Sequence, residues 1–478
     1  MKECLQKIRS GLVMVMIQLL CSCLLIYELI HLGMIPDRLL VLLIGSLVLL
    51  LLILFIVEWK GKKLRIPVRV LFVVISGLFL FGSCYIDRTV SMVEEISENN
   101  RVKIDKVVVV VDGHDSADTL DDLKKNRFGV QYQLKGHEIE ETVENISKEL
   151  GAEISIREYQ SLMEQISGLS KGEVRAIIFN EAYLDLLEEE FPELSLKVIY
   201  TRNVETKVEG KREIEDIRTE EESFLVYISG IDVYGSIKKT SRSDVNILAA
   251  VNPKTYQILL VNTPRDYYIE FPGITEGKKD KLTHAGIYGV QASMDALGGL
   301  YDIQPDFYAR VNFTSLEKIV DILGGIDVYS EYAFTAFTGT DSFVKGMNHL
   351  NGAQALVFCR ERHELPGGDS QRGKNQQAVL TAIIEKAISP AILKNAMKIL
   401  DSVTGNVETN MSTQQIQRLV KSQLDDPQEW TISSVDAIGR DGKAECFSMP
   451  DRMLYVMYPD GHSVREIKEM IRNVMEGK

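Results

Sequence analysis

Three long apolar segments follow one another within the first 86 residues, and they constrain the fold of this chain more than any other feature. Residues 39–57 are nineteen uncharged residues rich in Leu, Ile and Val, enough to cross a hydrocarbon core of roughly 30 Å. Residues 11–27 and 70–86 are slightly shorter and equally uncharged. One such segment could be a signal peptide or a buried core helix, but three in succession predict transmembrane helices at about 11–31, 39–57 and 68–86.

The distribution of charge gives these helices an orientation. Residues 1–84 carry nine Lys/Arg and four Asp/Glu, a net of +5, so the rest must carry −19 to reach the formal net charge of −14. Basic residues gather before the first segment and between the second and third. The positive-inside rule therefore predicts a multi-pass protein of the cell membrane with a cytoplasmic N-terminus, and an extracellular chain after about residue 87. The acidic outer part, which has no helix-turn-helix pattern, excludes nucleic acid as a partner.

The outer part is predicted to hold two α/β units separated by polar linkers at 88–104 and 203–222. The first unit, an accessory domain over 105–202, is predicted from short strand patterns at 106–111, 153–157, 174–180 and 196–200 and helical patterns at 139–150 and 181–191. Its sequence carries no phosphate-binding loop, no cluster of metal ligands and no pattern of a catalytic nucleophile. We therefore interpret this unit as a binding domain or a spacer and not as a catalytic domain.

The second unit, residues 223–478, is predicted to be one continuous α/β domain. Strands are expected at 224–231, 245–251, 256–262, 306–311, 326–329 and 431–438. Helices are expected at 284–300, 314–323, 351–358, 371–389, 392–400, 413–424 and 464–475. Its two cysteines, Cys359 and Cys446, give no basis for a disulfide, and no spacing of Cys or His indicates zinc.

Five arginines of this acidic unit stand where predicted strands or helices end: Arg242, Arg265, Arg360, Arg362 and Arg372. Taken singly, each has an ordinary explanation as part of a solvated loop or of an exposed charge run such as residues 360–362. Taken together, they indicate a site for phosphate oxygens, because guanidinium groups make planar, multidentate contacts to them.

The segment from 367 to 376 gives the sharpest local signal. Asp369 and Ser370 form a loop and N-cap sequence before a helix, and the first turn of that helix carries Arg372 and Lys374. Cations at a helix N-terminus oppose the macrodipole, and a bound anion would reverse that cost. Gln376 lies one turn after Arg372 and reaches the same volume. We therefore expect an anion site here.

Two aspartates near the ends of predicted strands, Asp232 and Asp244, are open to two interpretations. Aspartate is a common turn residue. Two carboxylates facing a phosphate also suit Mg²⁺, which usually takes one or two carboxylates together with phosphate oxygens and waters. His284 and His363 have no evident partner in the sequence, so we interpret both as structural or peripheral.

Seven motifs in this unit resemble the LytR–CpsA–Psr family in order and spacing, over a core of about 224–390. They are RSDVNIL (242–248), TPRDY (263–267), KLTHAG (281–286), LGGIDV (323–328), LNGAQAL (350–356), RER (360–362) and DSQRGKNQQ (369–377). The layout of three spans, an accessory domain and this domain is similar to the capsule-biosynthesis CpsA type of Gram-positive bacteria.

The resemblance implies an α–β–α domain around a central mixed sheet, with a hydrophobic pocket for a polyprenyl tail. It also implies an enzyme that transfers a glycopolymer, of capsular polysaccharide or teichoic acid type, from an undecaprenyl-pyrophosphate carrier to peptidoglycan. The acceptor is then the 6-hydroxyl of N-acetylmuramic acid, and the product is a phosphodiester. The implied partners are the lipid-linked donor, the peptidoglycan acceptor, the membrane and capsule-assembly membrane proteins.

Residue roles follow from the resemblance motif by motif. Asp232 and Asp244 would hold Mg²⁺, with Mn²⁺ as an alternative metal. The residues implied to bind the pyrophosphate are Arg242, Arg265, Lys281, Arg360, Arg362, Arg372 and Gln376. Catalytic roles fall to Arg265, Arg360, Arg362 and Asp369, with Asp369 or a metal-side carboxylate as the base. Two other functions stay open: a polyprenyl-pyrophosphate phosphatase that uses water as acceptor, and a non-catalytic regulator of polysaccharide chain length or expression.

Overall fold

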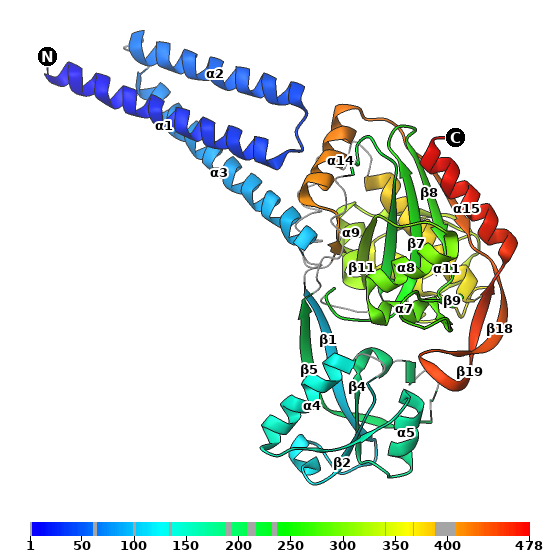
Figure 1. Ribbon diagram of the computed structural model, residues 1–478. Helices are drawn as coiled ribbons and strands as arrows, with labels where there is room; N and C mark the ends of the chain where they lie inside the picture. Colours follow the sequence, from blue (N-terminus) through cyan, green and yellow to red (C-terminus); the bar gives the residue numbers. More distant parts are fainter. Residues whose placement is uncertain are drawn as a thin grey trace.

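The computed structural model describes residues 2–60, 65–98, 102–132, 136–184, 186–187, 191, 193–207, 217–231, 237–339, 341–366, 368–387 and 407–478. Three apolar helices project from a folded body that contains two large sheets (Figure 1).

The projecting helices are α1 (Lys2–Leu32), α2 (Asp37–Lys60) and α3 (Arg65–Glu98). Their segments Leu12–Leu32, Asp37–Val57 and Ile66–Met92 are long and apolar enough to cross a membrane. Large side chains such as Leu42 and Phe81 are about 70% exposed, as expected for a surface that meets lipid. The predicted linker 88–104 is wrong in part, because α3 continues to Glu98 and the next strand begins at Val102.

The end of the helical bundle docks on helix α14 (Thr413–Asp425) of the C-terminal unit. Leu32 at the end of α1, Met34 of the following turn, and Ile86 and Val90 of α3 are buried, and the partly buried Ile416 and Val420 of α14 pack against them. Lys421 Nζ of α14 lies 2.8 Å from Asp37 Oδ1 at the start of α2. Apolar contacts and one ion pair thus attach the three helices to the C-terminal unit.

The accessory unit is a five-stranded mixed sheet. Its strands are β1 (Val102–Asp112), β2 (Arg127–Val130), β3 (Ser155–Glu158), β4 (Ala176–Asn180) and β5 (Leu196–Lys207), in the order β3-β2-β4-β1-β5. Helices α4 (Gly136–Leu150) and α5 (Leu162–Ser170) and the short η2 (Leu120–Leu123) and η3 (Glu181–Tyr183) complete it. β2 and α5 were not predicted. The predicted helix 181–191 begins as η3 and lies partly outside the described residues.

The C-terminal unit is built on a six-stranded mixed sheet in the order β16-β11-β6-β7-β8-β17. Its strands are β6 (Phe224–Ile231), β7 (Ser243–Asn252), β8 (Gln257–Asn262), β11 (Phe307–Asn312), β16 (Val407–Thr409) and β17 (Thr431–Asp436). β11 runs parallel to β6 and β17 parallel to β8, whereas β6, β7 and β8 are mutually antiparallel.

Helices cover both faces of this sheet, which gives the predicted α–β–α layers. One face buries Tyr227, Leu248 and Val261 against α7 (Leu282–Tyr288), α8 (Val290–Tyr301) and α15 (Gly461–Glu476). The opposite face buries Ile247 and Leu260 against α11 (Asp369–Ala387). Successive residues of a central strand point to opposite faces of the sheet, and apolar residues are buried on both faces. This explains the nearly continuous hydrophobic runs of the sequence.

Smaller elements complete the unit around α9 (Phe313–Ile322) and α10 (Gly352–Arg360). They are the strands β9 (Tyr268–Glu270), β10 (Lys279–Lys281), β12 (Ile326–Ser330), β13 (Phe334–Thr335), β14 (Ser342–Phe343) and β15 (Gly346–Leu350). The predicted helix 284–300 is instead two helices, α7 and α8, because Gly289 between them has a φ of +113°. The predicted helix 392–400 lies outside the described residues.

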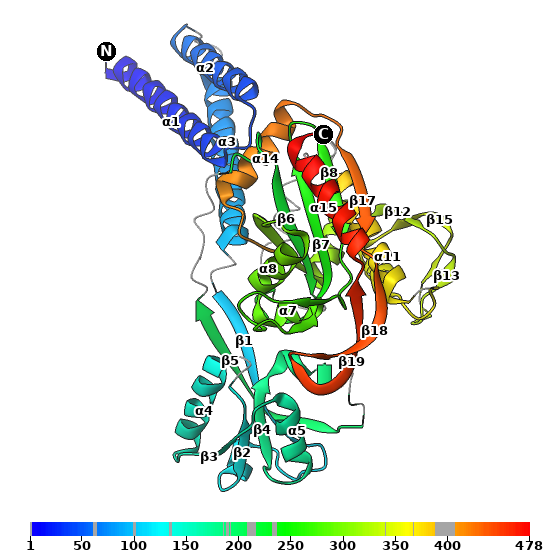
Figure 2. The ribbon, with the colours of Figure 1, turned by 45° about the vertical axis from the view of Figure 1, so that its right-hand side comes forward.

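A long hairpin of β18 (Gly439–Cys446) and β19 (Met449–Pro459) was not predicted. It leaves the edge of the central sheet after β17 and reaches down to the accessory unit beside α5 (Figure 2). Its residues Cys446, Met449 and Leu454 are buried in one cluster with Leu162 and Ile166 of α5. The hairpin therefore joins the two α/β units through a shared apolar core.

Candidate functional site

A cavity of about 760 Å³ opens at one end of the central sheet. Its walls come from the ends of β6 and β11, the start of β7, and parts of α9, α10 and α11. Parallel strands such as β6 and β11 deliver their carboxyl ends to the same edge, which is where open α/β sheets bind ligands. We call this space the arginine cavity, after the arginine side chains that line it.

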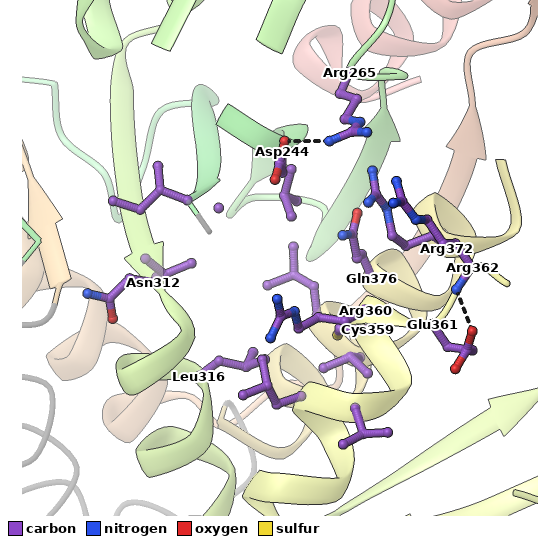
Figure 3. Close-up of a pocket in the computed structure, with 18 of the residues that line it drawn as sticks. Asp244, Arg265, Asn312, Leu316, Cys359, Arg360, Glu361, Arg362, Arg372 and Gln376 are labelled. Carbon is purple, nitrogen blue, oxygen red and sulfur yellow. Dashed lines mark hydrogen bonds and ion pairs between the residues drawn. The ribbon is translucent and has the colours of Figure 1, made fainter. Parts of the chain in front are cut away.

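All five arginines singled out in the sequence line this cavity. They come from five separate places: the residue before β7, the turn after β8, the last residue of α10, the loop behind it and the first turn of α11. In that order they are Arg242, Arg265, Arg360, Arg362 and Arg372. Gln376, one turn further along α11, lines the same cavity (Figure 3).

Asp244 is the carboxylate that faces these arginines most directly. Arg265 donates from Nη1 to Asp244 Oδ1 at 2.9 Å, and the Thr283 hydroxyl donates to the same oxygen at 3.2 Å. Burial alone would raise the pKa of this carboxyl, but the charges of Arg265, Arg242 and Arg372 outweigh it and hold the pKa below its ordinary value. Asp244 is therefore ionised at neutral pH.

Helix α7, in the KLTHAG motif, fixes the backbone around Arg242 and Asp244. A Cβ on Gly286 would lie 2.7 Å from both Ser241 O and Ser243 N, so this residue permits the close approach of the helix to the start of β7. Thr283 N–H donates to Arg265 O at 2.8 Å. Thr283 thus touches both members of the Asp244–Arg265 pair, a positioning role that the sequence alone did not reveal.

Glu361 is the second residue whose role the sequence analysis missed, since residues 360–362 could be an exposed charge run. It is only 5% exposed, and its carboxylate accepts four backbone N–H groups, from Phe337, Arg362, His363 and Glu364, at 2.7–3.1 Å. Burial raises its pKa, but these hydrogen bonds dominate and lower it. Glu361 holds the loop that presents Arg362 to the cavity.

Most of the remaining wall of the arginine cavity is apolar. Its aliphatic side chains come from β6, β7, β11, α9, α10 and α11, and include Leu316, Val311, Leu356, Val379 and Leu380. Cys359 also lines it, and burial raises the pKa of this thiol to about 12, so it stays a neutral, apolar surface. The cavity therefore combines a cationic end with an aliphatic one.

Four predicted residues are placed differently or lie beyond description. Lys281 does not line the arginine cavity; its Nζ lies 3.4 Å from Oδ1 of Asp266, whose Oδ2 lies 3.7 Å from Arg265 Nε. Lys374 does not line the arginine cavity either; it lines a neighbouring cavity, and its Nζ lies 3.6 Å from Glu331 Oε1. Asp232 is outside the described residues, and Asp369 is described only as the first residue of α11.

The two histidines differ from each other. His284 is fully buried, with Nδ1 2.6 Å from Asp280 Oδ1 and 3.0 Å from Ser448 Oγ, which agrees with a structural role. His363 instead lines the arginine cavity, where its ring lies 5.0 Å from that of Phe337. Phe337 is 70% exposed, so this pair stands at the mouth of the cavity.

The carboxylates of the arginine cavity differ in whether they have an oxygen to offer a divalent cation. Both oxygens of Glu361 are used by backbone N–H groups, whereas Arg265 and Thr283 both donate to Oδ1 of Asp244. Within the described residues, Asp244 Oδ2 is thus the carboxylate oxygen best placed for a metal. Among the side chains that the structure describes, no group of three or more His, Cys, Asp or Glu is placed to share a metal ion. One carboxylate fits Mg²⁺, which commonly completes its shell with phosphate oxygens and waters.

Residues 196–455 match the model of the LytR_cpsA_psr family. Over 201 residues the chain is 35% identical to the polyisoprenyl-teichoic acid–peptidoglycan teichoic acid transferase TagU of Enterococcus faecalis, covering 41% of this chain and 65% of that protein. Over 190 residues it is 37% identical to TagU of Bacillus licheniformis, covering 40% and 60%. The matched segment thus spans slightly less than two thirds of these relatives. The crystal structure of B. subtilis TagU is 29% identical, with a TM-score of 0.42, and covers 54% of this chain and 99% of that one.

Proposed function

Since this chain belongs to the LytR_cpsA_psr family, we propose that it is a membrane-anchored phosphotransferase that moves a glycopolymer from an undecaprenyl-pyrophosphate carrier to peptidoglycan. The acceptor atom is the 6-hydroxyl oxygen of N-acetylmuramic acid, and the glycopolymer is of capsular polysaccharide or teichoic acid type. One observation carries the proposal: five arginines from separate segments line a single cavity whose other wall is mostly aliphatic. The names of the relatives, teichoic acid transferases, support the same class of reaction.

The two ends of the arginine cavity match the two ends of such a donor. A pyrophosphate carries several negative oxygens, and guanidinium groups bind these with short, charge-assisted hydrogen bonds. Without an anion, five like charges around one cavity repel one another. The aliphatic end, with Leu316, Leu356 and Val379, suits the first isoprene units of the lipid.

The transfer needs no protein nucleophile. The acceptor oxygen attacks the phosphorus that bears the glycan and forms a new P–O bond, while the bond from that phosphorus to the bridging oxygen breaks. The bridging oxygen leaves with the electron pair as part of the lipid monophosphate. The proton of the acceptor hydroxyl passes to Asp369 or to a metal-side carboxylate such as Asp244. Catalysis consists of positioning and charge neutralisation, which are the main terms in phosphoryl transfer.

Within this scheme, Arg265, Arg360 and Arg362 stabilise the charge that develops on the phosphate oxygens, while Arg242, Arg372 and Gln376 bind and orient the pyrophosphate. Lys281 acts indirectly, through its ion pair with Asp266. Asp244, together with Asp232, would hold Mg²⁺ or Mn²⁺, and the metal would supply further neutralisation of phosphate charge.

The topology of the three spans is part of the proposal. Lys2, Lys7 and Arg9 precede the first span, and the basic residues from Lys60 to Arg69 lie around the junction of the second and third spans. These basic groups support a cytoplasmic N-terminus, with both α/β units on the outer side where peptidoglycan lies.

The proposal is tested with the full chain in lipid nanodiscs, a polyprenyl-pyrophosphate glycan, Mg²⁺ and peptidoglycan. Mass spectrometry of the digested wall should find the glycan joined to muramic acid through a 6-phosphodiester. Arg360→Ala should lower the transfer rate about 100-fold, whereas Arg465→Ala on the exposed face of α15 should leave it unchanged. Free glycan phosphate with no wall product would instead identify a phosphatase. No turnover of the donor would indicate a non-catalytic regulator.

A further inference from the structure

A second cavity, of about 370 Å³, lies directly beside the arginine cavity. Four residues line both spaces and so form the partition between them: Asp244, Arg265, Arg372 and Gln376. Among the described residues, Asp244 is the carboxylate common to both cavities. The proposed function fills the arginine cavity with the donor and leaves this second space unexplained.

The walls of the second cavity differ chemically from those of the first. Beyond the partition they carry three carboxylates, the ammonium of Lys374 and the phenol of Tyr455; the carboxylates are those of Asp266, Asp436 and Asp441. Asp436 accepts from Asn262 Nδ2 at 2.9 Å, and Asp441 accepts from the Tyr455 hydroxyl at 2.7 Å. An ionised carboxylate accepts about four hydrogen bonds, so both retain capacity for further donors. Carboxylates and a phenol suit a ligand rich in hydroxyl groups, because hydroxyl groups donate hydrogen bonds to these acceptors.

The position of this cavity suits the nucleophile of the transfer reaction. In-line displacement at phosphorus requires the attacking and leaving oxygens to lie on opposite sides of that atom. With the pyrophosphate held at the partition and the lipid in the arginine cavity, the opposite side opens into the second cavity. A sugar hydroxyl there approaches the phosphorus from the side away from the leaving lipid phosphate.

The hairpin β18–β19 supplies the outer wall of the second cavity. Gly439 and Asp441 come from β18, and Tyr455 and Met457 from β19. Met457 N–H donates to Asp266 O at 2.8 Å, which ties the hairpin to the segment that carries Arg265. At its far end, the guanidinium of Arg452 lies 3.7 Å from the centre of the Phe191 ring in the accessory unit. The accessory unit thus contacts the far end of the hairpin whose other end forms the outer wall of this cavity.

We propose that the second cavity is the acceptor site, which binds the carbohydrate of a peptidoglycan strand through its hydroxyl groups, with Asp441 and Tyr455 as specificity-determining residues. This inference rests on the proposed function and assigns it a second subsite. In this step the acceptor oxygen forms its bond to phosphorus from the second cavity, the bridging P–O bond breaks, and lipid monophosphate leaves from the arginine cavity.

Two variants and one matched control test the assignment in the full chain. Asp441→Asn keeps the shape and removes the charge, and Tyr455→Phe keeps the ring and removes the hydroxyl. Both side chains are exposed, so neither change is expected to unfold the protein. Glu445→Gln is the control, since it alters an exposed carboxylate on the same hairpin that lines neither cavity.

The readouts separate acceptor from donor. With a soluble disaccharide-peptide of N-acetylglucosamine and N-acetylmuramic acid, Asp441→Asn and Tyr455→Phe should raise the acceptor KM about tenfold and about threefold. Glu445→Gln should leave it unchanged, and the Kd for a fluorescent polyprenyl pyrophosphate should be the same in all four proteins. An unchanged acceptor KM in both variants overturns the inference while the proposed function stands.

If the wild-type chain shows no transfer, the proposed function is overturned, and a direct binding measurement then tests the acceptor site by itself. Isothermal titration of the full chain with the same disaccharide-peptide should then show binding that Asp441→Asn weakens about tenfold. Absence of binding to the wild-type chain, or equal binding to the variant, overturns the acceptor site independently of catalysis.

Discussion

Arg175 of the accessory unit and the five cavity arginines of the C-terminal unit are placed in two different ways. In the accessory unit, Arg175 donates from Nε and Nη2 to Asp115 at 2.9 and 2.8 Å, and from Nη1 to Asp122 O and Asn126 Oδ1. The carboxylate of Asp115 neutralises its positive charge, and the hydrogen bonds of Arg175 hold the segment from Asp115 to Asn126 in place. In the C-terminal unit, five arginines face one cavity where Asp244 and Glu361 are the described carboxylates.

The placement of the arginines indicates which unit binds a ligand, whereas the fold class does not. Both units are layered mixed sheets with helices, so the α/β class alone assigns a function to neither. A paired charge stabilises its own neighbourhood. Like charges that converge on a cavity are costly unless a ligand of opposite charge joins them. The variants below test this contrast, in order of expected effect.

The largest effect is expected from Arg265→Ala, because Arg265 lines both cavities and pairs with Asp244. Transfer should fall about 100- to 1,000-fold, the usual loss when one preorganised donor to a developing oxyanion is removed. Arg175→Ala, the matched arginine of the accessory unit, should leave kcat unchanged. Equal losses in both variants, measured by the wall-linkage assay, would remove the contrast between the two units.

A smaller effect is expected from Glu361→Gln, which replaces an ionised acceptor of four N–H groups by a neutral amide. Because the loop carrying Arg362 loses its anchor, kcat should fall about tenfold. Glu364→Gln, in the same loop and exposed, is the control. A glutamine variant with wild-type kcat would show that this loop needs no such anchor.

A third test addresses the coupling between the units. Leu162→Ala leaves a void in the apolar cluster that α5 shares with the hairpin. This change should destabilise the protein by about 2–4 kcal/mol and raise the acceptor KM about threefold. Ile139→Ala, in the separate core on the other side of the accessory sheet, should cost similar stability and leave the KM unchanged. Matching KM values in the two variants would mean that the hairpin is not held by the accessory unit.

The smallest effect concerns pH and stability. The pKa of Glu361 is lower in the folded chain than its ordinary 4.5, so the folded state gains stability above that value and loses it as the pH falls through the folded pKa. Glu361→Gln should therefore lower Tm at pH 7 by about 2 °C and much less at pH 3. An equal loss of Tm at both pH values would contradict the assigned direction of the shift.

The central sheet and the arginine cluster could be predicted because each follows from local pattern. The predicted strand 224–231 coincides with β6, since a strand buried on both faces is apolar throughout. The arginines follow strand and helix ends, and several of those ends meet at one edge of the sheet. Convergence was therefore inferable from topology.

The hairpin and the positioning residues could not be predicted, for physical reasons. In β19, Leu454 and Val456 are buried while Met453 and Tyr455 are exposed, so apolar residues on both faces conceal the alternation. Its partner is α5 of the other unit, nearly 300 residues away in sequence. The role of Glu361 depends on four backbone N–H groups, and side-chain patterns do not encode these.

The most direct test of the central claim is an experimental structure of the full chain in complex with a polyprenyl pyrophosphate. The account predicts the pyrophosphate within hydrogen-bonding distance of Arg265, Arg360 and Arg372, and the lipid against Leu316 and Leu356. The second cavity should remain open to the acceptor. A lipid pyrophosphate bound elsewhere, with no phosphate oxygen near these arginines, would contradict it.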